Sequence, residues 1–367
     1  MNPALKNYEC DGQMSIEDWL EDRERVRDLD MKVEVKEMEQ LTLDIEGIET
    51  TIDRQTDRQP QTLDEKIEQG QEALKLAAKM SRSYYNAPLI VTYSGGKDSD
   101  VMLHLAESCL DKDDFEVLNS HTTVDAPDTV YHIRQVFKRL NNKGIKTTID
   151  YHKQEDGTNI TMWNLIPKKL MPPTRIVRYC CQVLKETGTP NRMCALGVRE
   201  AESNKRQGRD IFATRGGKYT EGLFFSLSHA SEVYKESQEI QDDAWDCTLI
   251  KKMKENSDTM VNPIYKWLDI DIWEYIRLEH IEVNPLYAKG YVRVGCIGCP
   301  LAPYNIRIKE FTDYPQYKHL YINAFDRMLV VRRKKGKKCE WRTGQEVFDW
   351  WMEEGKHNIK GQMCLFD

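Results

Sequence analysis

An apolar segment that runs into two glycines and then into a helix most restricts the fold of this chain. Residues 87–93 are apolar and typical of a buried strand, and they lead into Ser94-Gly95-Gly96-Lys97-Asp98-Ser99. Apolar residues then recur with helical spacing over 101–105. Glycines in such a turn let backbone N–H groups converge on an anion, and the helix N-terminus adds positive potential. The segment therefore predicts a phosphate-binding turn, with Lys97 supplying charge and the serines supplying hydroxyl groups.

The following residues alternate between strand and helix patterns. We expect strands at 87–93, 115–121 and 146–152, separated by helices at 98–110 and 127–143. Strands spaced by amphipathic helices are typical of a doubly wound sheet, in which ligands bind beyond the carboxyl ends of the strands. The prediction is an α/β fold with a mostly parallel, Rossmann-like sheet, an N-terminal helical arm and a helical C-terminal region.

Composition divides the chain into three predicted parts. Residues 1–60 are acidic and read as an accessory helical arm, either an oligomerisation element that makes a homo-oligomer or a poorly packed tail. Residues 62–300 form the nucleotide-binding domain. Residues 301–367 are helical and carry a basic run, Arg332–Lys338, which is either a solvated loop or a contact for a polyanion.

The chain has no apolar run long enough to cross a membrane, and its first residues lack a signal-peptide pattern. We therefore expect a cytoplasmic protein without membrane contact.

An acidic residue is expected near the glycine turn. Strand 115–121 is followed by Asp125 and Asp128, and the carboxyl ends of parallel strands share one edge of a sheet. Asp125 is a candidate for contact with a ribose hydroxyl. The alternative, which we favour, is that Asp125 or Asp128 caps the helix that follows.

The chain has ten cysteines, and in a reducing compartment clustered cysteines indicate metal binding or catalysis. Cys180 and Cys181 are adjacent, and Cys296 and Cys299 form a C-x-x-C motif followed by proline. A direct Cys-Cys pair suits a [4Fe–4S] cluster better than a tetrahedral zinc site. We favour the cluster, with a zinc site or ordinary buried thiols as alternatives.

Together these motifs resemble the phosphoadenylyl-sulfate (PAPS) reductase family, within the PP-loop ATP pyrophosphatase (adenine nucleotide alpha hydrolase) superfamily. The resemblance rests on the SGGKDS loop, both cysteine pairs and the segments 197–206, 262–267 and 271–273. It implies an enzyme that binds ATP with Mg²⁺, or adenylyl sulfate or PAPS. ATP would be cleaved between its α and β phosphates, and a [4Fe–4S] cluster would take part in sulfur transfer.

The resemblance also assigns residues to roles. If helical, Arg199, Glu202 and Arg206 share one face and clamp phosphate or sulfate, or else form a surface salt-bridge ladder. The predicted catalytic residues are Lys97, Asp98, Arg199 and Arg206. The predicted nucleotide contacts are Tyr93, Ser94, Gly95, Gly96, Lys97, Ser99, Asp125 and Glu202.

The intact SGGKDS loop is more similar to family members that split ATP, including the sulfate adenylyltransferase small subunit and the iron–sulfur ATPase of DNA phosphorothioation systems. This similarity implies DNA as the acceptor and a cysteine desulfurase as sulfur donor. One alternative is a reductase with Cys364 as nucleophile and thioredoxin as reductant. The other is a nucleotide-sensing regulator without turnover.

The C-terminal tail allows three interpretations. Gln362–Phe366 resembles the peptide that docks on the bacterial sliding clamp. Alternatively, Cys364 is the reductase nucleophile, or the tail only packs Phe366 onto the body.

Overall fold

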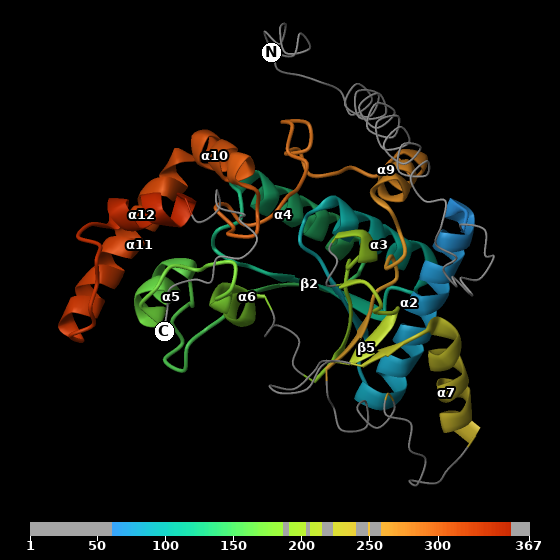
Figure 1. The fold of residues 1–367 in the computed structure, drawn as a ribbon. Helices are drawn as coiled ribbons and strands as arrows, with labels where there is room; N and C mark the ends of the chain where they lie inside the picture. The colour runs from blue at the N-terminus through green and yellow to red at the C-terminus, as the bar shows by residue number, and fades with distance from the viewer. Residues whose placement is uncertain are drawn as a thin grey trace, which may run out of the picture. The chain divides into compact units, whose positions relative to one another are not determined.

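A computed structural model shows the fold of the chain (Figure 1). It describes residues 61–185, 191–202, 206–214, 223–239, 249 and 258–353. The chain divides into two compact units, one made of 1–62 with 285–293 and the other of 63–284 with 294–367. In the smaller unit, the described loop 285–293 turns at Gly290, whose φ is +76°. The features below belong to the larger unit.

Within the described residues, seven strands form one mostly parallel sheet in the order β3-β2-β1-β4-β7-β5-β6. The strands are β1 (Leu89–Thr92), β2 (Phe115–Ser120), β3 (Thr147–Asp150), β4 (Met193–Ala195), β5 (Phe212–Thr214), β6 (Phe224–Phe225) and β7 (Thr259–Val261). Neighbouring strands from β3 to β7 run parallel, whereas β5 is antiparallel to both β7 and β6. The predicted mostly parallel sheet is confirmed.

Strand β1, which lies inside the sheet, is apolar because it is covered on both faces. Leu89, Ile90 and Val91 of β1 are all buried, as expected for a parallel sheet between helices. Register pairs Val91 with Val117 of β2. The carboxyl ends of β1 and β2 therefore lie side by side at one edge of the sheet, about 5 Å apart.

Helices connect and cover these strands. They are α2 (Leu63–Tyr85), α3 (Lys97–Cys109), α4 (Pro127–Asn142), α5 (Met162–Lys169), α6 (Tyr179–Leu184), α7 (Leu227–Glu239), α9 (Asp269–Leu278), α10 (Tyr304–Asp313), α11 (Pro315–Lys334) and α12 (Gly344–Glu353). Helix α2 packs on α3 and on β1, β4 and β7. Helices α10 to α12 gather beside α5, which contacts α11 (Figure 1). The predicted helical C-terminal region is present.

The start of α4 differs from the prediction. Its N-cap is Ala126, which provides no side-chain bond, and Pro127 occupies the first turn, where its fixed φ suits a helix. Asp125 lies before the cap and its carboxylate accepts a hydrogen bond from the Thr122 N–H at 3.1 Å. The expectation that Asp125 or Asp128 is the cap is wrong, because proline already favours this helix start.

Several predicted features fall outside the described residues: the arm 1–60, the tail Gln362–Phe366, and Cys10, Cys247 and Cys364. Among the helices that are described, none combines the length and apolar character needed to cross a membrane.

Candidate functional site

The glycine turn between β1 and α3 has a shape that its neighbours enforce. Gly95 has a φ of +73°, and a Cβ there would lie 2.9 Å from Cγ1 of Ile133. The buried Asn284 donates from Nδ2 to the Gly95 carbonyl at 2.8 Å and to Oγ1 of Thr129 at 3.1 Å. Helix α3 begins at Lys97, directly beyond the turn. Its N-terminus therefore faces the edge of the sheet, an arrangement that binds phosphate.

Ser99 holds the turn together. Its hydroxyl donates to the Gly96 carbonyl at 2.7 Å and receives hydrogen bonds from the Gly96 N–H at 3.1 Å and the Ser94 hydroxyl at 3.2 Å. The Ser99 side chain is buried, whereas Ser94 is exposed. Of the predicted hydroxyl contacts, the placement of Ser94 fits a ligand contact and that of Ser99 fits support of the loop.

Tyr93 lies beneath the turn, and its placement does not fit the predicted nucleotide contact. The residue is only 2% exposed, and its hydroxyl donates to Oδ1 of Asp100 at 2.5 Å. Nε2 of His132 lies 2.9 Å from the same hydroxyl and 3.3 Å from the Asp100 carboxylate. Burial raises the pKa of Asp100, although the bonds from His132 and Tyr93 oppose this. The buried side chains of Tyr93, Asp100 and His132 thus support the glycine turn from the protein interior.

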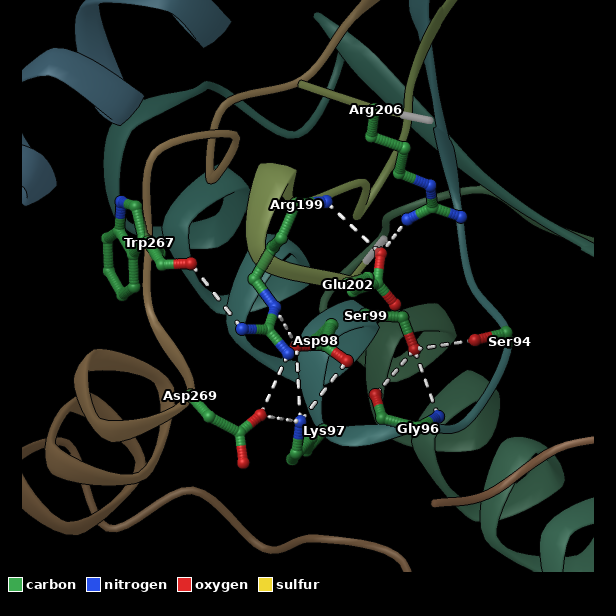
Figure 2. Close-up of polar contacts among 10 residues, drawn as sticks. All are labelled: Ser94, Gly96, Lys97, Asp98, Ser99, Arg199, Glu202, Arg206, Trp267 and Asp269. Atoms are coloured by element: carbon green, nitrogen blue, oxygen red, sulfur yellow. Dashed lines mark hydrogen bonds and ion pairs between the residues drawn. The ribbon is translucent and has the colours of Figure 1, made fainter. Parts of the chain in front are cut away.

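Lys97, Asp98, Arg199 and Asp269 form one charged network in front of the loop (Figure 2). Nζ of Lys97 lies 2.7 Å from Oδ1 of Asp269 and 3.5 Å from the Asp98 carboxylate. Arg199 places Nε 2.6 Å from Asp98 and NH2 2.9 Å from the same Oδ1 of Asp269. The structure thus brings three of the predicted catalytic residues together, and adds Asp269.

Exposure differs sharply within this network. The side chains of Lys97 and Arg199 are 7% and 5% exposed, whereas that of Asp269 is 46% exposed. Burial acts to raise the pKa of Asp269, but Lys97 and Arg199 outweigh it and hold that pKa below its usual value. Two buried cations are therefore neutralised in part by a carboxylate that is half open to solvent.

The second predicted arginine does not join this network. The described part of this segment contains a 3₁₀ turn over Glu200–Glu202, and residues 203–205, which the predicted helical face would include, lie outside the described residues. Glu202 accepts a hydrogen bond from the Arg199 N–H at 3.2 Å and forms an ion pair with Arg206. The two guanidinium groups lie on different sides of Glu202, and the Arg199 guanidinium is the one that reaches Asp98 (Figure 2).

The four cysteines of the two predicted pairs are neighbours in space. Cys180 donates a hydrogen bond to Cys181, and this bond, burial and the charges of Cys181, Cys296 and Cys299 raise the pKa of Cys180. The same bond and the Arg178 guanidinium, whose NH2 lies 3.3 Å from Sγ of Cys181, lower the pKa of Cys181 to about 5. The result is a group of four thiols in which Cys181 is the favoured thiolate.

A lysine lies beside the same sulfurs. Burial raises the pKa of Cys296 to about 11, while the charge of Lys185 opposes this rise. In return, the charge of Cys296, followed by those of Asp125 and Cys181, raises the pKa of Lys185. Within the described ranges, no three His, Cys, Asp or Glu side chains are grouped closely enough to hold a single metal ion.

The C-x-x-C loop is held in place by the sheet edge and the C-terminal helices. Its Ile297 N–H donates to the Val124 carbonyl at 2.8 Å, and the Tyr321 hydroxyl donates to the Ile297 carbonyl at 3.0 Å. The Gly298 N–H donates to Glu310 at 2.7 Å. Gly298 has a φ of +71°, and a Cβ there would lie 2.6 Å from Cζ of Phe311.

Asp125 lies beside Cys296, one of the four cysteines of the two predicted pairs. Its backbone forms an antiparallel bridge with Cys296, and its carboxylate raises the pKa of that thiol. The predicted contact of Asp125 with a ribose hydroxyl stays a prediction. The bridge also places Cys296 relative to the glycine turn, because residues 121–125 follow β2 whereas the glycine turn follows β1. The glycine turn and Cys296 therefore lie beyond the ends of neighbouring strands.

Sequence reasoning missed four residues of this site: Asp269, Asn284, Arg178 and Lys185. Asp269 lies between the segments 262–267 and 271–273, and Arg178 and Lys185 flank the Cys-Cys pair, so proximity to recognised motifs was an available signal. Asn284 belongs to none of these motifs and is 189 residues away from Gly95, so only the tertiary structure brings the two together.

A glycine turn of this form, between strand and helix of a parallel sheet, lies where nucleotide-binding α/β folds hold phosphate groups. The family model of the phosphoadenosine phosphosulfate reductase domain matches residues 88–302, more than half of the chain. The chain belongs to this family, whose members are enzymes of sulfur metabolism.

Individual relatives are distant. An uncharacterized protein of Methanocaldococcus jannaschii is 24% identical over 83% of this chain, which spans 60% of the length of that relative. Sulfate adenylyltransferase subunit 2 of Bradyrhizobium sp. is 26% identical, over 70% of this chain and 79% of that protein. Among solved structures, PAPS reductase from Candida auris in complex with phosphate is 13% identical, with 65% of this chain and 97% of that one covered and a TM-score of 0.34.

Proposed function

We propose that this chain binds ATP at the glycine turn, cleaves it to AMP and pyrophosphate to activate an acceptor, and uses a [4Fe–4S] cluster in sulfur transfer. The observation that carries the proposal is the shared edge of the sheet. The phosphate-binding turn follows β1, and the loop that bridges to Cys296 follows the adjacent strand β2. A nucleotide held at the turn would thus lie near the sulfurs.

The residues of the turn suit the departing pyrophosphate. In the proposed step, an acceptor oxygen attacks the α-phosphorus, the bond from that phosphorus to the α–β bridging oxygen breaks, and pyrophosphate leaves with the bonding electrons. AMP is then joined to the acceptor oxygen and leaves with that oxygen when sulfur attacks the acceptor. Negative charge then grows on the leaving group. Lys97, Arg199 and the N-terminal amides of α3 lie where they can neutralise it, and such positioning and charge neutralisation carry most of phosphoryl-transfer catalysis.

Mg²⁺ would add neutralising charge on the phosphates. Asp98, whose carboxylate already faces Lys97 and Arg199, is the proposed magnesium ligand at the turn.

The cysteine group fits a cluster by its chemistry. Cys180, Cys181, Cys296 and Cys299 supply four thiols close enough to affect one another's charge, which is the donor set of a [4Fe–4S] cluster. Arg178 and Lys185 offset the negative charge of such thiolates. When bound, the cluster would supply electron transfer or a site for sulfur. The chain's own contribution is a rigid C-x-x-C loop and two adjacent cations.

Partners complete the proposal. A cysteine desulfurase is the proposed sulfur donor, and DNA is the proposed acceptor. The basic run Arg332–Lys338 supports a polyanionic acceptor, because it ends α11 with exposed lysines. Arg332 joins this end to α5 by donating to the Leu170 carbonyl at 2.6 Å, next to Lys168 and Lys169. Docking of the tail on a sliding clamp stays a prediction.

One experiment tests the activity. Anaerobically purified full-length protein is incubated with MgATP, with and without duplex DNA, and separately with adenylyl sulfate, and both pyrophosphate and sulfite are measured. We expect pyrophosphate from ATP, more of it with DNA, and none from Lys97→Ala. Lys143→Ala removes the same charge from an exposed ion pair with Glu107 and should behave as wild type. Unchanged turnover in Lys97→Ala would refute the role of the loop.

The cluster is tested by absorbance of the same preparation. A broad band near about 400 nm that bleaches with dithionite is expected, and it should be lost in Cys181→Ser. Zinc in place of iron in that preparation would contradict the cluster.

The second candidate function is an adenylyl-sulfate or PAPS reductase, favoured by the family model that the chain matches. It requires Cys364 and thioredoxin. Sulfite from adenylyl sulfate without pyrophosphate from ATP supports it, and release of neither product supports a non-catalytic regulator.

A further inference from the structure

Asp269 occupies a position that an anionic ligand would be expected to take. Its Oδ1 lies 2.7 Å from Nζ of Lys97 and 2.9 Å from NH2 of Arg199, so one oxygen neutralises both cations. Arg199 uses its other nitrogens elsewhere, with Nε at the Asp98 carboxylate and NH1 at the Trp267 carbonyl. Asp269 is therefore the contact that the two cations share in front of the loop (Figure 2).

Charge balance explains why a carboxylate is present here. Lys97 and Arg199 have almost no exposed side-chain surface, and a buried cation without a nearby anion is strongly unfavourable. In the free protein, Asp269 and Asp98 supply that negative charge. A polyphosphate arriving at the turn brings more negative charge to the same cations, and Asp269 would then repel it.

The position of Asp269 allows its side chain to move away from Lys97 and Arg199. It is the first residue of α9, follows the N-cap Leu268, and is nearly half exposed, so its side chain can turn towards solvent. Once turned, it would still lie at a helix N-terminus, where a negative charge is favoured. Asp271, two residues further on, differs: it is buried, pairs with Lys66 and accepts a hydrogen bond from the Leu268 N–H.

We propose that Asp269 is a built-in competitor of the nucleotide: it holds Lys97 and Arg199 in place in the free protein, and the polyphosphate displaces it. The proposal rests on the proposed function, because it takes ATP as the ligand of this turn. Its consequence is that ATP affinity is held below the value that the two cations alone would give, while the cations stay preorganised for the phosphates.

The test is calorimetric titration of ATP into the full-length protein in EDTA, without divalent cations. Asp269→Asn removes the competing charge and should bind ATP about tenfold more tightly than wild type, and the gain should shrink at high salt. Asp269→Glu keeps the charge and should bind within about threefold of wild type. Glu274→Gln, an exposed position on the same helix, removes an equal charge away from the network and serves as control.

Each alternative result is informative. Equal or weaker ATP binding by Asp269→Asn in EDTA, with normal binding by wild type, overturns the proposal. A loss of affinity that appears only with Mg²⁺ also overturns it and makes Asp269 a magnesium ligand. No ATP binding by wild type in either buffer refutes the proposed function itself.

A measurement on the unmodified protein covers the case in which the Asn variant does not fold. Hydrogen exchange of the first turn of α9 should become faster when ATP binds, because displaced Asp269 no longer ties this turn to the loop. Slower exchange there on ATP binding overturns the proposal.

Discussion

Replacing Gly95 by alanine should destabilise the protein more than the same change at a glycine turn where a Cβ would meet no neighbour. Two costs add at this position. A φ of +73° is unfavourable for an L-residue by about 1–2 kcal/mol. In addition, the new Cβ would lie 2.9 Å from Cγ1 of Ile133 and 3.2 Å from Cγ2 of Thr129, and such overpacking costs about 1–3 kcal/mol. The expected loss in unfolding free energy is about 2–5 kcal/mol.

A matched variant separates the two costs. Gly157 has a φ of +82°, but a Cβ there meets nothing within 4 Å, so Gly157→Ala carries the backbone cost alone. Urea unfolding of both variants and wild type gives the steric part as their difference. In a double-mutant cycle, Gly95→Ala should cost less in an Ile133→Ala background than in wild type, because Ile133→Ala removes the nearest atoms on α4. ATP binding should be lost in Gly95→Ala and kept in Gly157→Ala.

The reasoning is refuted if Gly95→Ala and Gly157→Ala lose equal stability, since the packing of α4 against the turn would then make no energetic difference. It is also refuted if the Ile133→Ala double variant shows simple additivity, because residues in contact should show coupling.

Two further predictions concern the surroundings of the site. Glu107 accepts hydrogen bonds from Arg139 at 2.9 and 2.8 Å and from Lys143 at 2.8 Å. Burial acts to raise the pKa of Glu107, but Arg139 and Lys143 outweigh it and lower that pKa from 4.5. Glu107→Gln should therefore cost about 1 kcal/mol of unfolding free energy near pH 7. The folded pKa lies below the unfolded one, so this difference should vanish as the pH of urea unfolding falls well below 4.5; a constant difference contradicts it. Gly298→Ala should cost about 2 kcal/mol or more and weaken the cluster absorbance, because its Cβ would lie 2.6 Å from a ring atom. Gly336→Ala, with φ +65° and no neighbour within 4 Å, is its control, and equal losses would contradict the steric argument.

The fold was predictable because its signals are local. An apolar strand, a Gly-Gly turn and an amphipathic helix appear in unbroken order, and the strands at 89–92, 115–120 and 147–150 lie within those predicted. Each strand and helix there is specified by side-chain periodicity within about ten to fifteen residues. The antiparallel pairing of β5 is different: its three residues pair with β7, 45 or more residues away, and no periodic pattern marks them.

The contacts at the site that the sequence did not predict also join segments far apart in the chain. The shared face proposed for Arg199, Glu202 and Arg206 relied on spacing alone, whereas the partners of the buried Arg199 guanidinium, Asp98 and Asp269, belong to other segments. Asp125 was placed correctly at the sheet edge, but its backbone pairs with Cys296, 171 residues away. Whether a side chain at an edge faces a ligand, a cap or another loop depends on contacts between distant segments.

The amino-acid sequence alone determined that this chain has a glycine turn between strand and helix, two pairs of cysteines and a mostly parallel sheet. Backbone freedom at glycine, thiol chemistry and apolar periodicity are properties of residues and their near neighbours. Only the tertiary structure decided that the cysteines gather beside the turn and that Asp269 joins Lys97 to Arg199. It also decided that Tyr93 and Ser99 hold the loop from within. Those features arise from packing between segments, where the burial of charge selects the partner of each side chain.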